Sequence, residues 1–228
     1  SGEDVDAFAF DPADGNGPGS KSFFSTTDDF DTGTAEGEDA EVRHELLFGD
    51  RVVRCFRRRP RSLWDLFIES VHRDPQADAL LWDPNGRMSY GELANLADVL
   101  SGGLRTLGIS KGDRVAALTT NRFEYVALAL AVWRTGAIYV PLDSRLRTNE
   151  IRHILSHSGA RALLCQGDLI ESLPSRSLVP ELENIIVLDR APAAAGQLSL
   201  AQLVDAGREY GPSEIHEEDT AAILYTSG

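Results

Sequence analysis

Hydrophobic and polar positions follow two periods in the chain after Ser62, one typical of helices and one typical of buried strands. Leu93, Leu96, Leu100 and Leu104 recur at intervals of three and four residues, which places them on one face of a helix. Helical spacing, or an apolar run of helical length, predicts helices over 62–72, 89–107, 123–135, 149–158 and 199–207. Short apolar runs between them predict strands over 114–120, 137–143, 160–165 and 184–189, and a last strand that opens 220–228.

Residues at the ends of these segments support the same division. Ser62 and Thr148 are expected to cap helices, and Ser89 with Glu92 has the S-x-x-E spacing of a capping box. Glycines at positions 108, 136 and 159 follow three of the helices, where glycine favours termination.

The alternation of apolar strands with helices predicts an α/β fold, with a mostly parallel sheet covered by helices on both faces. In such sheets, ligands bind beyond the carboxyl ends of the strands. The last expected strand leads directly into Tyr225-Thr226-Ser227-Gly228, which therefore lies where a ligand is expected. Hydroxyl groups and a glycine turn suit an anion, although four such residues are a weak signal by themselves.

Charge divides the chain unevenly. Residues 1–45 carry 13 of the 36 acidic side chains and 2 of the 22 basic ones, a net charge of −11, and residues 46–228 carry the other 23 and 20, a net of −3. We expect three parts: an acidic, disordered tail over 1–45, a basic lead-in over 46–61, and a folded domain over 62–228. The nearly neutral body argues against a nucleic-acid-binding surface.

The basic lead-in contains six arginines between Arg51 and Arg61. Such a cluster is compatible with RNA or a membrane surface. Because apolar residues interrupt it and Pro60 closes it, a strand or hairpin that leads into the first helix is favoured. The arginines could also pair with the acidic tail.

The remaining features indicate a cytoplasmic protein without a membrane span. The longest apolar run, from Tyr125 to Trp133, is too short to cross a bilayer, and the N-terminus lacks the pattern of a signal peptide. Cys55 and Cys165 are far apart in the sequence and have no partners at metal spacing, so reduced thiols are expected. Because position 1 is not Met, the chain is expected to be processed, tagged or incomplete there.

Four segments in a fixed order carry a resemblance to a known family: MSYGEL, GISKGDRVAAL, WRTGAIYVPLD and AAILYTSG. This array resembles the N-terminal part of the adenylate-forming (AMP-binding) superfamily, over about Ser62 to Gly228. The family includes acyl- and aryl-CoA ligases, nonribosomal peptide adenylation domains and firefly-type luciferases. Its phosphate loop usually reads T-S-G-[ST]-[ST]-G-x-P-K, of which this chain contains Thr226, Ser227 and Gly228.

The resemblance implies the chemistry. Such enzymes attack the α-phosphate of Mg-ATP with a carboxylate, release pyrophosphate, and pass the acyl group to CoA or to a carrier-protein thiol. It implies ATP, Mg²⁺ and CoA as cofactors, and Thr226, Ser227 and Gly228 as the start of the ATP phosphate loop. No catalytic or metal-binding residue of the family falls within the sequence, so the 228 residues alone are expected to be inactive.

Three functions stay open. The segment VPLDSRLRTNEIRHILSHSGARALLC and the lead-in resemble an acyl-CoA ligase more than a peptide-synthetase domain. An amino acid adenylation domain is the alternative within the family. An alternative of another class is a catalytically dead homologue that acts as an interaction module through its acidic tail.

Several polar residues outside the motifs have plain structural interpretations. Asp143 is expected to cap the turn that follows its strand. His153 and His157, four residues apart, lack a third metal ligand and are expected on a solvated helix face. Arg145 and Arg147 are weaker candidates for contact with a phosphate or CoA.

Overall fold

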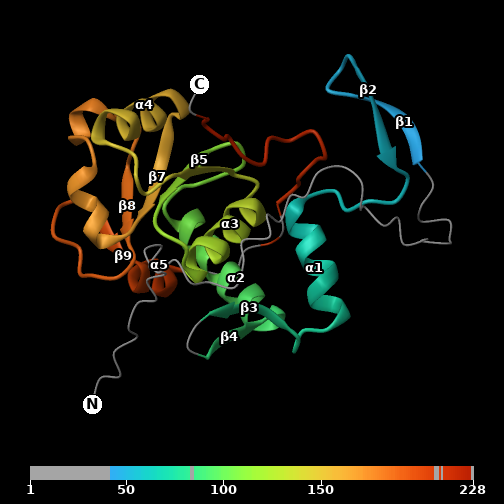
Figure 1. The fold of residues 1–228 in the computed structure, drawn as a ribbon, viewed down its shortest axis with the longest axis horizontal. Coiled ribbons are helices and arrows are strands. Elements are labelled where there is room, and N and C mark those ends of the chain that lie inside the picture. Colours follow the sequence, from blue (N-terminus) through green and yellow to red (C-terminus); the bar gives the residue numbers. More distant parts are fainter. Residues whose placement is uncertain (1–41, 83–84, 208–210, 212, 227–228) are drawn as a thin grey trace, which may run out of the picture. The chain divides into compact units, whose positions relative to one another are not determined.

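A computed structural model describes residues 42–82, 85–207, 211 and 213–226 (Figure 1). Most of the predicted acidic tail, residues 1–41, lies outside the described residues, as do Ser227 and Gly228 of the predicted phosphate loop. The chain divides into two compact units, and the boundary between them falls between Pro60 and Arg61.

A β-hairpin forms the described part of the smaller unit. Strands β1 (Val42–Leu47) and β2 (Arg51–Phe56) pair in antiparallel fashion, with Leu46 opposite Val52. The Arg59 guanidinium donates two hydrogen bonds of 2.9 Å to the Glu45 carboxylate. The hairpin predicted for the arginine-rich segment is therefore confirmed, and it begins inside the last four residues assigned to the tail.

A five-stranded parallel sheet is the centre of the larger unit. Its strands are β5 (Arg114–Leu118), β6 (Ile138–Leu142), β7 (Ala160–Cys165), β8 (Asn184–Val187) and β9 (Gln197–Ser199). Their order in the sheet is β6-β5-β7-β8-β9, and every neighbouring pair is parallel. The parallel α/β fold predicted from the alternating pattern is confirmed.

Two of the three predicted N-terminal helix caps in this unit are confirmed. The helices are α1 (Leu63–Arg73), α2 (Tyr90–Thr106), α3 (Phe123–Thr135), α4 (Thr148–Ser158) and α5 (Leu200–Ala206), with 3₁₀ turns at Gly167–Ser172 and Arg176–Leu178. Ser62 caps α1, and Ser89 with Glu92 forms the predicted capping box of α2. The cap predicted at Thr148 is wrong by one residue. Thr148 is the first helical residue, and the Glu150 carboxylate accepts the backbone N–H of Arg147, the N-cap.

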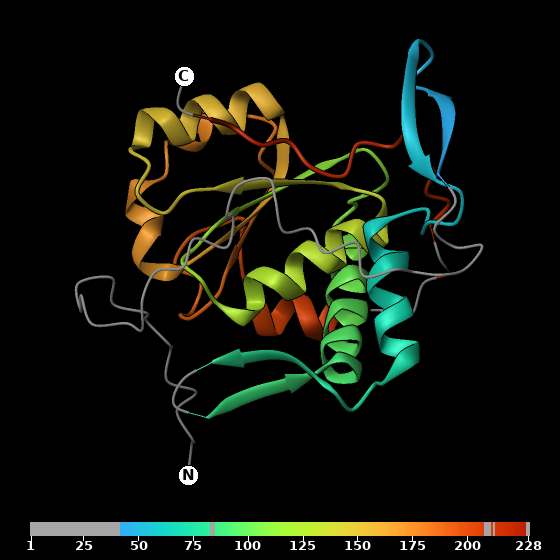
Figure 2. The same ribbon diagram turned by 45° about the vertical axis from the view of Figure 1, so that its right-hand side comes forward.

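Each face of the sheet carries its own apolar core, because neighbouring residues of a strand point to opposite faces. Val115 and Ala117 face α2, α3 and α5, whereas Ala116 and Leu118 face α4. Figure 2 shows α4 on one side of the sheet and α2 with α3 on the other. Both faces of every central strand are therefore buried, which explains why the strands are continuous apolar runs.

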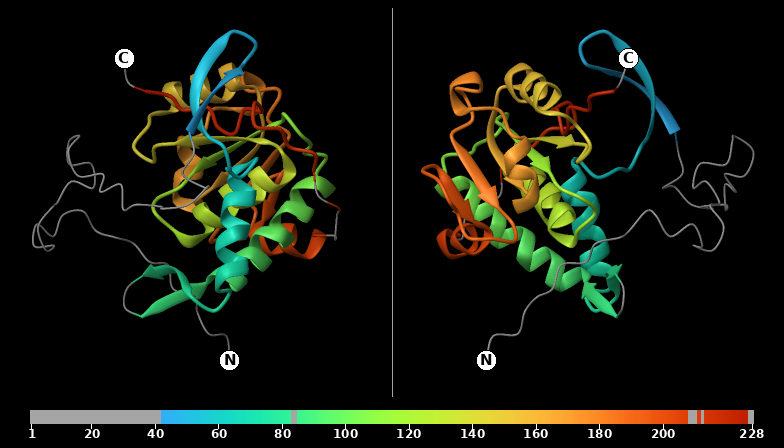
Figure 3. Two further views of the ribbon diagram at one scale, coloured as in Figure 1. Left: turned by 90° about the vertical axis from the view of Figure 1, so that its right-hand side faces the viewer. Right: turned by 60° about the vertical axis from the view of Figure 1, so that its left-hand side comes forward.

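Helices α2 and α5 approach each other closely at a glycine. A Cβ atom at Gly103 would lie 2.3 Å from the Leu203 carbonyl oxygen, so a larger residue would push the two helices apart. Figure 3 shows α5 beside α2, and Leu203 is buried at this contact. The pair covers one face of the sheet.

Four strands differ from the prediction: one predicted strand does not form, and three observed strands were not predicted. The strand predicted within 220–228 is wrong: residues 220–226, the described part of the segment, make one isolated parallel bridge, between Ala222 and Tyr139 of β6. Two backbone hydrogen bonds at Tyr139 hold it, too few for a strand. The fifth strand of the sheet is β9 instead, and its three residues are too short to give a periodic signal. The sequence pattern also missed the hairpin of β3 (Asp78–Trp82) and β4 (Gly86–Ser89).

Candidate functional site

The candidate site is the edge of the sheet at which the parallel strands end, here called the carboxyl edge. Strands β5, β6, β7 and β8 end at this edge, and polar residues follow each of them. The chain moves from β5 to β6 on one side, whereas β7 leads to β8 and β9 on the other. Such a reversal of strand order is where open α/β sheets place their ligands.

The last described residues arrive at the same edge. Because Ala222 bridges Tyr139 in parallel, residues 222–226 run in the direction of β6. The Ala221 carbonyl accepts hydrogen bonds from the Tyr139 backbone N–H and from the Trp133 indole, both at 3.0 Å. Thr226 follows and is exposed, so its hydroxyl can reach a ligand beyond the edge. Ser227 and Gly228 lie outside the described residues.

Two histidines of α4 contact the residue before Thr226. His157 Nδ1 lies 2.8 Å from the Tyr225 hydroxyl, and the rings of His153 and His157 stack with centroids 5.6 Å apart. His153 and His157 are exposed, as predicted for a solvated helix face. The prediction did not include their contact with Tyr225. We call His153, His157 and Tyr225 the Tyr225 cluster.

A glutamine links the ends of β5 and β7. Gln166, the first residue after β7, accepts hydrogen bonds through Oε1 from the Thr119 hydroxyl at 3.3 Å and from the Thr120 hydroxyl at 2.8 Å. It also accepts the Thr120 backbone N–H at 3.2 Å. This one side chain fixes both loops where the strand order reverses.

A nearly buried ion pair lies beside the glutamine. The Arg122 guanidinium donates two hydrogen bonds, of 2.8 and 3.2 Å, to the Glu124 carboxylate, and the two side chains are 10% and 7% exposed. Asp189, after β8, lies 3.3 Å from Arg122 and accepts the Gly167 backbone N–H at 2.7 Å. The hydrogen bond to Glu124 raises the pKa of Arg122. These groups satisfy one another, so they rigidify the edge.

The loop after β6 behaves as its sequence indicates. Asp143 accepts the Arg145 backbone N–H at 2.9 Å, which confirms that it caps the turn. Hydrogen bonds from the exposed Arg145 guanidinium lower the pKa of Asp143 to about 2. Arg147 serves as the N-cap of α4 through its backbone.

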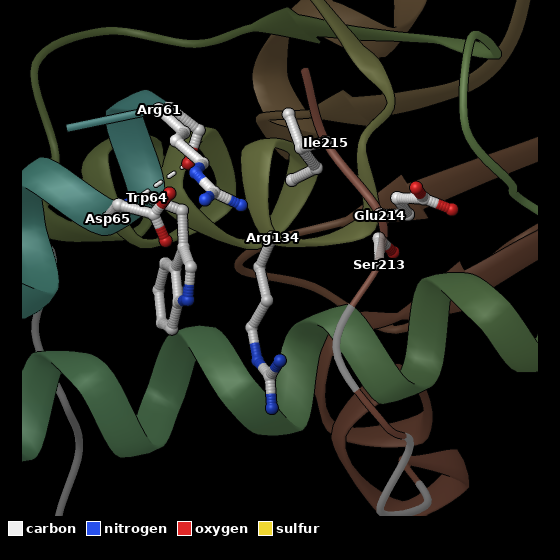
Figure 4. Close-up of a pocket in the computed structure, with 8 residues that line it drawn as sticks. Arg61, Trp64, Asp65, Arg134, Ser213, Glu214 and Ile215 are labelled. Atoms are coloured by element: carbon white, nitrogen blue, oxygen red, sulfur yellow. Dashed lines mark hydrogen bonds between the residues drawn. The ribbon is translucent and has the colours of Figure 1, made fainter. Parts of the chain in front are cut away.

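A polar cavity of about 240 Å³ lies away from this edge. Its lining includes Trp64, Arg134, Ser213 and Glu214 (Figure 4). Arg134 is in the last turn of α3, which leads into the amino end of β6, so the cavity is at the opposite end of the strands. The Arg134 guanidinium lies 5.3 Å from the centre of the Trp64 ring and forms an ion pair with Asp98. These contacts tie α1, α2 and α3 together, and the cavity plays no part in the candidate site.

Two features are absent from the described residues: a cluster of metal ligands and a membrane-spanning helix. They contain no group of three His, Cys, Asp or Glu side chains that could hold a metal ion. Among the helices that the structure describes, none has the length and apolar character needed to cross a bilayer. Cys55 and Cys165 are both free, as predicted.

Sequence reasoning missed Gln166, Arg122, Glu124 and Asp189. A signal was available for two of them, because Gln166 and Asp189 are among the first polar residues after apolar strands. For Arg122 and Glu124, nothing in the pattern indicated that a charged pair at the start of a helix would be buried.

Comparison with known proteins points to one family. The family model described as "AMP-binding enzyme" matches residues 67–228. A long-chain-fatty-acid–CoA ligase of Thermus thermophilus is 32% identical over 143 residues, which cover 62% of this chain and 26% of the ligase. Surfactin synthase subunit 2 of Bacillus subtilis is 33% identical over 170 residues, or 74% of this chain and 4% of the synthase.

A solved structure agrees with these matches. The anthranilate CoA ligase AuaEII, solved in complex with anthranoyl-AMP, has a TM-score of 0.69 and 25% identity to this chain. The match covers 75% of this chain and 33% of AuaEII. The chain therefore spans a third or less of the length of these relatives.

Proposed function

Because this chain belongs to the AMP-binding enzyme family, we propose that the protein activates a carboxylate with ATP, giving an acyl-adenylate and pyrophosphate. The observation that carries the proposal is the position of Thr226. It lies at the carboxyl edge of a parallel sheet, inside the segment that the family model matches, and Ser227 and Gly228 follow it in the sequence. That edge is where α/β sheets bind their ligands.

In this proposal, Thr226, Ser227 and Gly228 begin the loop that holds the ATP phosphates. Hydroxyl groups and the backbone N–H groups of a glycine turn donate hydrogen bonds to anions. Donors held at the pyrophosphate stabilise the negative charge that develops on the leaving group. The proposal includes Mg²⁺ with ATP but assigns no described residue to the metal, since none forms a suitable cluster.

We propose CoA as the acceptor of the acyl group. Two observations support this choice: the ligase of Thermus thermophilus and AuaEII are both named as CoA ligases. The matching synthase of Bacillus subtilis favours the second candidate, an amino acid adenylation domain that loads a carrier-protein thiol.

The test is carboxylate-dependent exchange of labelled pyrophosphate into ATP, measured on the natural protein with every residue that its gene encodes. A panel of fatty, aromatic and amino acids should include a substrate that drives exchange well above the rate without carboxylate. Adding CoA or a phosphopantetheinylated carrier protein then shows which thiol receives the acyl group. Absence of exchange with every acid would overturn the proposal and favour the interaction-module alternative.

Two further parts of the proposal concern the chain itself. We propose that residues 62–228 are the first part of the adenylating domain, preceded by an acidic tail and a basic lead-in. We also propose that residues 1–228 alone do not catalyse the reaction, because they span a third or less of the matched relatives. Pyrophosphate exchange by the isolated 228 residues would refute the second point.

A further inference from the structure

The segment that leads to Thr226 is weakly held by its backbone. Between its described residues and β6 there are two backbone hydrogen bonds: Tyr139 N–H to the Ala221 carbonyl at 3.0 Å, and Ile223 N–H to the Tyr139 carbonyl at 2.9 Å. Within the described residues, no backbone hydrogen bond holds Leu224, Tyr225 or Thr226. The Leu224 side chain is 72% exposed, so it does not anchor the segment either.

The Tyr225 side chain anchors the last part of the segment, after Ile223, which packs against the same core. It packs against the apolar core on the α4 face of the sheet, and its hydroxyl lies 2.8 Å from His157 Nδ1. Its ring meets His157 and His153 edge to face, with centroids 5.7 and 6.3 Å apart and planes at 84°. The two histidines lie one helical turn apart with their rings stacked, and both rings contact Tyr225.

We propose that His157 is a positioning residue for the ATP phosphate loop: with His153 it holds Tyr225 and so sets the direction in which Thr226 leaves the sheet. This inference rests on the proposed function. Tyr225 is bonded directly to Thr226, so fixing the tyrosine at both its ring and its hydroxyl restricts where the loop can begin.

The geometry favours this role over two others for the histidine pair. A metal site is excluded among the described residues, which offer no third ligand. A purely solvated role does not fit, because the hydroxyl contact is within hydrogen-bond distance and the three rings are mutually oriented. A neutral histidine nitrogen can accept or donate, and a tyrosine hydroxyl can do both, so the bond forms with either tautomer.

The kinetic consequence follows from preorganisation. If Tyr225 already fixes the position of Thr226, Thr226 loses less conformational freedom when it binds a phosphate, which favours ATP binding. Binding of the carboxylate substrate does not require Thr226 to lose this conformational freedom. Removing the anchor should therefore weaken the interaction with ATP and leave the interaction with the carboxylate unchanged.

The experiment compares variants of the natural, full-length protein in pyrophosphate exchange. His157→Ala should raise KM for ATP by about threefold to tenfold, the loss expected for one hydrogen bond, with KM for the carboxylate unchanged. His157→Asn places an amide where Nδ1 was and should recover most of the affinity. His72→Ala, a change at an exposed histidine near the end of α1, is the matched control and should leave both constants unchanged.

A double-mutant cycle gives the second measurement. Tyr225→Phe removes the hydroxyl but keeps the ring, and on its own should raise KM for ATP about as much as His157→Ala. The double variant should raise KM for ATP little more than either single variant does, because both changes break the same hydrogen bond. Thermal unfolding of each variant, within a few degrees of the parent, confirms that the fold is retained.

The outcomes separate this inference from the proposed function. If the parent protein shows no exchange with any carboxylate, the proposed function fails, and the inference falls with it. If the parent is active but His157→Ala leaves KM for ATP unchanged, only the inference is overturned. A rise in KM for the carboxylate equal to that for ATP would also overturn it, because a general loss of structure would then explain the effect.

Discussion

The buried ion pair between Arg122 and Glu124 gives a quantitative prediction about the carboxyl edge. Glu124→Gln keeps the shape of the side chain but leaves the Arg122 guanidinium without its main counter-charge at a position that is only 10% exposed. Removing one partner of a buried pair typically costs about 3–5 kcal/mol. Because Asp189 remains 3.3 Å from Arg122, we expect a smaller loss of unfolding free energy, about 2–3 kcal/mol.

Urea unfolding of the chain, followed by tryptophan fluorescence, measures this loss. With a slope of about 2 kcal/mol per molar urea, the midpoint should fall by about 1–1.5 M. Asp78→Asn is the matched control, because its ion pair with Arg87 is exposed, with side chains 33% and 69% accessible. Asp78→Asn should lower the free energy of unfolding by less than about 1 kcal/mol.

A double variant tests the cause of the loss. Arg122→Met combined with Glu124→Leu removes both charges and fills the space with apolar atoms, and should recover at least half of the stability lost in Glu124→Gln. Equal midpoints for Glu124→Gln and Asp78→Asn would refute the reasoning. A double variant less stable than the single one would show that the pair itself, and not the unpaired charge, is the source of stability.

Three further predictions follow from single residues. Gly167→Ala should lower the unfolding free energy by about 1–3 kcal/mol in urea unfolding, because the new Cβ would lie 2.6 Å from the Asp189 carboxylate. Cys165 should react with a thiol reagent only on unfolding, since burial raises its pKa to about 12, whereas Cys55 reacts in the folded chain. The pKa of Asp143 is lowered from 3.8 to about 2, so the ionised carboxylate stabilises the folded state above pH 4, and this stabilisation is lost as the pH falls toward 2. The stability difference between Asp143→Asn and the parent should therefore be under about 1 kcal/mol at pH 7, shrink as the pH falls from 4 to 2, and vanish below pH 2.

The central sheet was predictable because burial on both faces leaves a clear trace in the sequence. Val115 to Leu118 and Ala162 to Cys165 are continuous apolar runs, and every residue in them is buried. The hairpin that contains the arginine cluster was also predictable, because its apolar residues are interrupted by arginines and Pro60 ends the run.

Other elements leave no such trace. The three residues of β9 are half-buried and too few to show a period, and the pairing to β8 that makes them a strand is a tertiary contact. The apolar run before Thr226 looks like a strand, but whether it forms one depends on how many hydrogen bonds β6 offers at its outer edge.

The candidate site was predictable only in part. The position of Thr226 at the carboxyl edge followed from the order of strands and from the resemblance. The Tyr225 cluster did not follow, because Tyr225 and His157 are 68 residues apart in the sequence and only the fold brings them together. The Arg122–Glu124 pair was equally hidden, since charged residues two positions apart are most often solvated.

The measurement that tests the account most directly follows oxygen atoms from the carboxylate. The full-length protein is given ATP and a substrate whose carboxylate carries ¹⁸O at both positions, and the acyl product is trapped with hydroxylamine. If the carboxylate attacks the α-phosphate, one ¹⁸O atom appears in AMP and none in pyrophosphate. Label in inorganic phosphate with ADP as the other product, or AMP without label, would contradict an acyl-adenylate and with it the proposed function.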